Sequence, residues 1–117
     1  MKLKEIRDIL NATVISGQDK MDIEIVSAGG ADLMNDVLSA TAKGSVLLTG
    51  QTTPDVIDIC IMAEVGAVVI VRGKKPSQKV IELAQANSIP LLMTQDSMFV
   101  SCGRLYMQGL RGMDGSW

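Results

Sequence analysis

The feature that most constrains the fold is a pair of matching strand–loop–helix units set 22 positions apart. The apolar segments 46–49 and 68–71 each lead into a short loop that ends in proline, Pro54 in the first unit and Pro76 in the second. Proline is tolerated in a first helical turn because its missing N–H would have no partner there. The repeat therefore predicts two consecutive β–α units, with each proline in the first turn of its helix.

A third unit of the same kind follows, with a strand near Leu91 and a helix that runs to about Leu110. Uniformly apolar strands that alternate with helices indicate parallel pairing, with helices covering the sheet. The expected sheet contains Val46–Thr49, Val68–Arg72 and Leu91–Thr94. The predicted fold class is a single-domain α/β three-layer sandwich with a mostly parallel sheet. The domain is expected to span residues 1–111, with 112–117 as a frayed C-terminal tail.

The first third of the chain carries less regular signals. Residues 2–11 have the apolar spacing of a short amphipathic helix. Segments 12–16 and 23–27 are each predicted as a strand, and Gly29–Gly30 is expected to break the second one. Asp32 is then expected to cap a helix that runs to about Thr41.

The charge and the composition exclude several classes of partner. The net charge is −2 and the chain has only three aromatic residues, which argues against a nucleic-acid-binding surface. The amino terminus lacks the apolar stretch of a secretory signal, and the longest apolar runs are far too short to cross a membrane. Cys60 and Cys102 both lie in apolar helical patterns, where reduced, buried thiols are usual. The sequence predicts a cytoplasmic protein that binds neither nucleic acid nor membrane.

Catalytic signatures are sparse. The chain has no histidine, which excludes Ser–His and Cys–His nucleophilic pairs and histidine metal ligands. The two cysteines are isolated rather than spaced as in zinc or iron–sulfur sites, and no phosphate-loop or dinucleotide fingerprint occurs. We therefore expect a non-catalytic protein without a metal or a cofactor.

The carboxyl edge of the predicted sheet is the expected place for a ligand. Ligands of open α/β sheets bind there, near helix N-termini whose free N–H groups favour anions. Arg72 stands out because a buried strand ends directly on it and its guanidinium suits phosphate or carboxylate. A nucleotide or another anion is the expected ligand. The candidate ligand contacts are Thr49, Gly50, Thr52, Thr53, Arg72, Gly73, Lys75 and Thr94.

These residues also allow a purely structural interpretation. In that alternative Thr53 and Asp96 are helix caps, and Lys74 and Lys75 are merely solvated. The helix expected at 55–65 is the other informative segment, since it is apolar on nearly all sides. A helix that covers one sheet face needs an apolar stripe of about 100°. A second surface should therefore cover it, either a neighbouring helix of the same chain or the partner subunit of a homodimer.

The stretch from Val46 to Leu110 resembles the DRTGG-domain family, and the opening helix and segment 32–38 also fit it. The family is named for an Asp-Arg pair after one strand and a Thr-Gly-Gly after the next. Thr52–Thr53 and Val71–Arg72–Gly73 hold these places here, and Asp55 and Lys75–Pro76 also match. Gly73 is the one naming residue that the chain keeps.

This resemblance implies a fold like that of the N-terminal domain of HPr kinase. The family's small bacterial and archaeal domains occur alone or beside CBS, phosphotransacetylase and cobyrinate-synthase-like domains. The departures from the naming motif imply a divergent, stand-alone member that accompanies hydrogenase- or NADH-dehydrogenase-like redox subunits. We therefore expect a small regulatory or assembly module. The alternatives are a structural accessory subunit without a ligand and a phosphotransferase-like enzyme.

Overall fold

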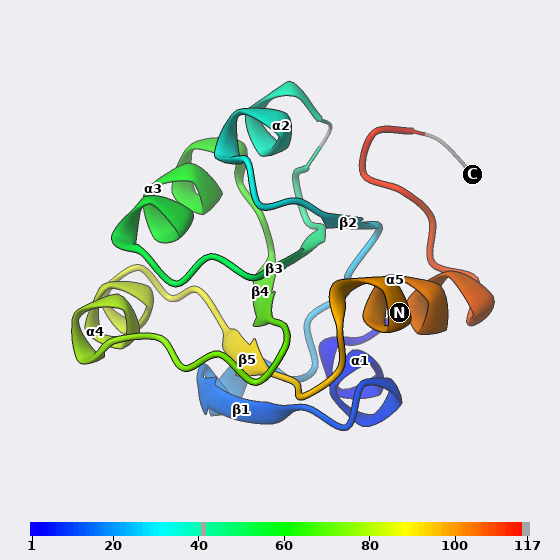
Figure 1. Ribbon diagram of the computed structural model, residues 1–117, viewed down its shortest axis with the longest axis horizontal. Helices are drawn as coiled ribbons and strands as arrows, with labels where there is room; N and C mark the ends of the chain where they lie inside the picture. Colours follow the sequence, from blue (N-terminus) through cyan, green and yellow to red (C-terminus); the bar gives the residue numbers. More distant parts are fainter. Residues whose placement is uncertain (41, 116–117) are drawn as a thin grey trace.

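The computed structural model describes residues 1–40 and 42–115, which form a five-stranded sheet between two layers of helices (Figure 1). In chain order the elements are α1 (Leu3–Ile9), β1 (Thr13–Ser16), the 3-10 turn η1 (Gln18–Lys20), β2 (Ala28–Gly30), α2 (Met34–Ser39), β3 (Val46–Thr49), α3 (Pro54–Ala63), β4 (Ala67–Ile70), α4 (Gln78–Ala86), β5 (Leu91–Met93) and α5 (Met98–Met107).

The strand order across the sheet is β1-β5-β4-β3-β2. The four strands from β2 to β5 are parallel, and β1 pairs with β5 in the antiparallel direction. Leu47 lies opposite Val68, and Val69 lies opposite Leu92. The predicted parallel sheet of three apolar strands is thereby confirmed, with a parallel strand and an antiparallel strand added at its two edges.

Both faces of the sheet are buried, which explains why its central strands are apolar at every position. On one face, Leu47 and Val68 pack in a core that includes side chains of α2, α3 and α4. On the other face, Leu48 and Val69 pack in a core with side chains of α1 and α5. The predicted three-layer α/β sandwich is confirmed.

The edge strand beside β3 lies further along the chain than the pattern predicts. Segment 23–27 forms no strand. Instead, Leu3 donates a backbone hydrogen bond to Ile23 and Ile25 donates one to Met1, so this segment follows the amino terminus. The glycines expected to end the strand form it, as part of Ala28–Gly30. A side chain at Gly30 would collide with Met98 and Cys102, because α5 packs directly on this strand.

Two helix starts also differ from expectation. Pro54 is the first residue of α3, as predicted, but Pro76 lies outside α4, whose N-cap is Ser77. The Ser77 hydroxyl accepts a hydrogen bond from Val80 N–H (3.3 Å), a cap that Pro76 cannot provide. Helix α2 begins at Met34 and is not capped by Asp32, which has other partners. Its expected end at Thr41 lies outside the described residues.

The segment expected to fray after Arg111 is attached to the edge of the sheet. Gly112 forms a parallel bridge with Ala28, and Met113 donates a backbone hydrogen bond to Ala28 (2.8 Å). The Met113 side chain is only 7% exposed, because the glycines of β2 leave room for it. The boundary of the domain at residue 111 stays a prediction.

Neighbouring helices of the same chain cover much of the apolar surface of α3. It contacts α2 and α4, and Ile57 is fully buried within the chain. Helix α1 lies on the opposite face of the sheet and does not cover it. Ile61 and Met62 remain 43% and 68% exposed. The neighbouring helices of the same chain are thus the main cover, and a homodimer through or near this helix stays a prediction.

Candidate functional site

The carboxyl ends of the four parallel strands bring the expected segments to one edge of the sheet. Val71 donates a backbone hydrogen bond to Thr49, and Thr94 donates one to Ile70, so the pairing continues to the ends of the strands. Ala31 likewise donates to Leu48 beyond β2. The loops that begin here therefore lie side by side, as predicted.

The two strand-end threonines orient these loops. The Thr49 hydroxyl accepts a hydrogen bond from Gln51 N–H (3.1 Å), and the Thr94 hydroxyl accepts one from Asp96 N–H (3.2 Å). Thr94 also donates to the carbonyl of Leu10 (2.8 Å), at the end of α1. Both threonine side chains are buried. In this conformation their hydroxyls hold the backbone in place and are not presented at the surface.

Arg72 sits at the centre of this edge in a left-handed backbone conformation, with φ of 62°. Its N–H donates to the carbonyl of Asp96 (2.8 Å), and the next N–H, of Gly73, donates to the carbonyl of Thr94 (2.8 Å). These two bonds tie the loop after β4 to the loop after β5. They hold a non-glycine residue in a conformation that costs about 1 kcal/mol or more. The Arg72 side chain is 42% exposed.

The Arg72 guanidinium lies directly over Gly50. A Cβ added at Gly50 would fall on its terminal nitrogen, and the next nearest group beyond the guanidinium is the Asp32 carboxylate. Glycine is therefore required at position 50 for the guanidinium to occupy this place. The predicted candidates Gly50 and Arg72 are thus brought together.

Asp32, which the sequence suggested as a helix cap and placed in a segment expected at this edge, is the acceptor at this site. Gly50 N–H donates to its Oδ1 (2.7 Å) and the Thr49 hydroxyl donates to the same oxygen (3.3 Å). Its Oδ2 lies 3.9 Å from Nη2 of Arg72. A backbone N–H, a hydroxyl and a guanidinium therefore surround one carboxylate, which is the donor set that binds oxyanions.

The remaining candidates form the rim. Thr53 occupies the N-cap position of α3, but its side chain makes no capping hydrogen bond. Thr52 is half-buried, and Lys75 is exposed on the loop after β4. A side chain at Gly73, where φ is 65°, would collide with the amide of Gln95.

Asp96, the other expected cap, belongs to a second ion pair. Ser97 is the N-cap of α5, and its hydroxyl accepts a hydrogen bond from Val100 N–H (3.2 Å). The Asp96 carboxylate lies 3.1 Å from the Arg104 guanidinium, so its charge is balanced on the α5 side of the edge.

On the other side of Asp32 an open hollow of about 590 Å³ lies between the start of α2 and the start of α3. Asp32, Asp36 and Asp55 line it. Among the described residues, no three carboxylates or cysteines come close enough together to hold a metal ion. The donors that contact the Asp32 carboxylate therefore lie on its Arg72 side, and acidic groups lie on the opposite side.

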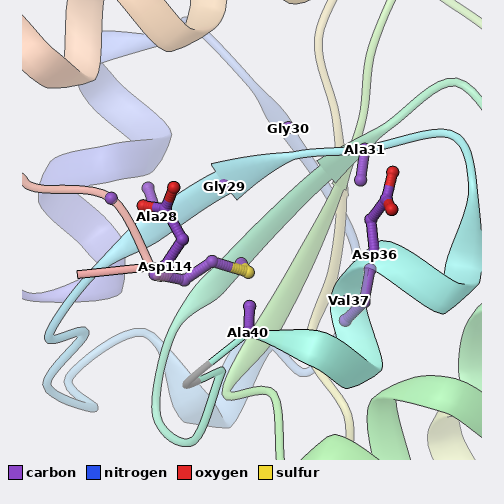
Figure 2. A pocket seen from close by; sticks show the side chains of 10 residues that line it. Ala28, Gly29, Gly30, Ala31, Asp36, Val37, Ala40 and Asp114 are labelled. Carbon is purple, nitrogen blue, oxygen red and sulfur yellow. The ribbon is translucent and has the colours of Figure 1, made fainter. Parts of the chain in front are cut away.

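A second hollow, of about 260 Å³, lies between β2, α2 and the C-terminal segment. Figure 2 shows its wall, in which Ala28–Ala31 face Val37 and Ala40, with Asp36 at one end and Asp114 at the other. None of the predicted ligand contacts lines this hollow.

Comparison with known families decides the relationship that the motif suggested. The model of the DRTGG domain matches residues 5–106. The chain belongs to the DRTGG-domain family. Within the DRTGG domain, the positions that resemble the family's two naming motifs follow neighbouring strands, Thr52–Thr53 after β3 and Arg72–Gly73 after β4. Of these residues, Arg72 lies beside the Asp32 carboxylate.

Among solved structures, the DRTGG chain is similar to the CBS and DRTGG domains of the regulatory region of Clostridium perfringens pyrophosphatase, a crystal structure in complex with the activator diadenosine tetraphosphate. The TM-score is 0.74 at 21% identity, over 94% of this chain and 47% of that one. The chain thus spans about half the length of that structure, and the likeness establishes the shared fold. No curated protein matches the chain. None of the helices in residues 1–40 and 42–115 is long and apolar enough to span a membrane.

Proposed function

We propose that this DRTGG domain is a non-catalytic regulatory module that binds a nucleotide or another phosphate-bearing anion at the carboxyl edge of its sheet. Arg72 is the cationic contact, and Gly50 N–H is the main backbone donor. The pyrophosphatase region that shares the fold is complexed with a phosphate-rich dinucleotide, which supports this class of ligand.

One observation carries the proposal. The edge already holds an oxyanion, the Asp32 carboxylate, in contact with Gly50 N–H, Thr49 and Arg72. A phosphate oxygen fits the same donors, since a guanidinium and a backbone N–H bind both kinds of group. The incoming anion displaces the Asp32 carboxylate from these donors, and the Asp32 side chain is 44% exposed.

Calorimetric titration of AMP, ATP and inorganic phosphate tests the proposal. We expect the wild type to bind at least one of them and Arg72→Ala to lose that binding. Asp32→Asn should bind more tightly, because the competing negative charge is gone. Lys79→Ala is the matched control, since Lys79 is an exposed cation on α4 outside the predicted contacts.

The same carboxylate supports a second candidate function. If the Asp32 carboxylate occupies the donors at this edge permanently, the domain is a structural accessory subunit with no ligand. The acidic hollow beside Asp32 favours this candidate, because three carboxylates repel an approaching phosphate. Absence of binding heat for all three anions, in the wild type and in Asp32→Asn alike, would select it.

The expected association with a hydrogenase- or NADH-dehydrogenase-like complex remains a proposal that rests on the resemblance to divergent family members. Co-purification of the untagged complex subunits with the tagged chain tests it. Recovery of the chain alone, under conditions that keep such a complex intact, would contradict it.

A further inference from the structure

The outward face of α5 is apolar where a surface helix is normally polar. Phe99 and Met107 are 87% and 84% exposed, and Val100 and Tyr106 beside them are 38% and 47% exposed. Ser101 and Leu105, on the opposite side of the same helix, are buried against the sheet. The helix therefore presents apolar side chains in both directions. The Arg111 guanidinium lies over the Tyr106 ring, 4.7 Å from its centroid, and no described residue buries Phe99 or Met107.

The exposed apolar side chains form an outer stripe along α5, and this stripe is symmetrical about a glycine. Phe99, Gly103 and Met107 follow one another at intervals of four residues, so they lie on one helical face with the glycine in the middle. No atom lies near the place of a Cβ at Gly103, which leaves a gap between two large side chains. A second helix can approach closely at such a gap.

We propose that a second copy of this chain docks on this stripe, α5 against α5, about a twofold axis that passes Gly103. The two helices then run antiparallel. Phe99 of each copy packs against Met107 of the other, a contact between an aromatic ring and a thioether that is favourable in itself. The twofold axis makes the stripe complementary to itself, as isologous interfaces require.

The charges on the helix allow identical copies to meet. Arg104 is the one charged residue within α5, and its guanidinium is held 3.1 Å from the Asp96 carboxylate of the same chain. Each Arg104 therefore approaches the twofold axis with its charge balanced within its own chain, and the other cation of the patch, Arg111 over the Tyr106 ring, lies away from the axis. A lipid surface is a weaker fit, because membrane-binding helices carry several cations beside their apolar face.

The area is sufficient for a specific contact. Side chains of this kind at these exposures offer roughly 500 Å² per copy, so two copies bury about 1,000 Å², the lower bound of a specific interface.

Light scattering on the intact chain tests the proposal. We expect a concentration-dependent dimer for the wild type and a monomer for Met107→Glu and Phe99→Glu, both at exposed positions that leave the fold intact by circular dichroism. Met62→Glu, on the exposed side of α3, separates this interface from the alternative homodimer through α3, and we expect it to remain dimeric. A monomeric wild type, including one that binds phosphatidylcholine vesicles instead, would overturn the proposal. So would a dimer that Met62→Glu dissociates and Met107→Glu does not.

Cross-linking tests the twofold geometry directly. In a Cys102→Ala background, a mixture of Phe99→Cys and Met107→Cys chains should form a disulfide-linked dimer on mild oxidation. Neither variant should form it alone, because in an antiparallel pair each position meets the other and not itself. Cross-links within either single variant, or none in the mixture, would contradict this arrangement.

Discussion

The carboxylate of Asp32 reaches across the end of β3 to within 3.9 Å of the Arg72 guanidinium. The two residues follow β2 and β4, which are separated by one strand, and Gly50 at the end of that strand lies between them. A Cβ at Gly50 would meet both groups. Most of the predictions below depend on this contact.

Asp32→Ala should lower the free energy of unfolding by about 1–3 kcal/mol, because it leaves the buried Gly50 N–H without its acceptor. Arg72→Ala should cost less, about 0–1 kcal/mol, since the ion pair is nearly half-exposed on both sides. Urea denaturation measures both values. Asp36→Ala, in the same hollow, is the control and should change little. Equal losses for Asp32→Ala and Arg72→Ala would show that the ion pair, and not the backbone donor, sets the cost.

Arg72→Gly should be more stable than Arg72→Ala by roughly 1 kcal/mol, because glycine adopts the positive φ at this position without strain. Both variants lack the guanidinium, so neither should bind an anion. Thermal unfolding of the two proteins side by side gives the comparison. A glycine variant that is less stable than the alanine variant would mean that the left-handed conformation is absent in solution.

Gly50→Ala should weaken anion binding with little loss of stability. The new methyl group displaces the far end of the Arg72 side chain, which is flexible, and φ at position 50 is not positive. Calorimetric titration of Gly50→Ala with the same anions measures the loss. Binding as tight as in the wild type would show that the guanidinium does not need the place over Gly50 to hold the anion.

Parts of this edge were predictable from the sequence and parts were not. The strand ends were predictable because buried parallel strands are uniformly apolar and stop where polar residues begin, as at Thr49 and Arg72. The partner of Arg72 was not, because Asp32 lies forty positions earlier in the chain and its spacing also fits a helix cap. Only the three-dimensional pairing of β2 with β3 brings that carboxylate to Gly50.

The edge strand β2 and the start of α4 were the least predictable elements. Gly29–Gly30 reads as a break, since glycine disfavours strands, but close packing from both sides of β2 requires small residues there. Pro76 matches Pro54 in phase, yet the serine after it supplies a stronger helix start. In each case a long-range contact or a competing cap outweighed the local pattern.

Met113→Ala should destabilise the fold by about 2 kcal/mol or more, since a buried methionine side chain covers β2. Removal of residues 112–117 should have at least the same effect, because the Ala28 carbonyl then also loses the hydrogen bond from Met113 N–H. Met62→Ala, at an exposed position on α3, serves as the control. If the truncated chain were as stable as the whole chain, residues 112–117 would not contribute to the fold and the predicted domain boundary at residue 111 would stand.

The stability of the fold should fall in alkaline solution, in part through Cys60. Burial raises the pKa of its thiol from 9.0 to about 12. Between these values the unfolded chain releases a proton that the native state retains, so stability is lost as the pH rises from 9 towards 12. The slope approaches about 1.4 kcal/mol per pH unit, and no effect of this thiol is expected below pH 9. Urea denaturation at a series of pH values should give a free energy of unfolding that falls less steeply with pH for Cys60→Ala than for the wild type. An unchanged slope would mean that the thiol ionises freely in the native protein.

The most direct test of the central claim is an NMR titration of the ¹⁵N-labelled chain with ATP and with inorganic phosphate, for the wild type and for Arg72→Ala. The claim predicts that amide shifts in the wild type cluster at Gly50, Gln51 and Gly73, and that Arg72→Ala abolishes them. Shifts that cluster around the hollow between β2 and α2, or that persist unchanged in Arg72→Ala, would contradict an anion site at this edge of the sheet.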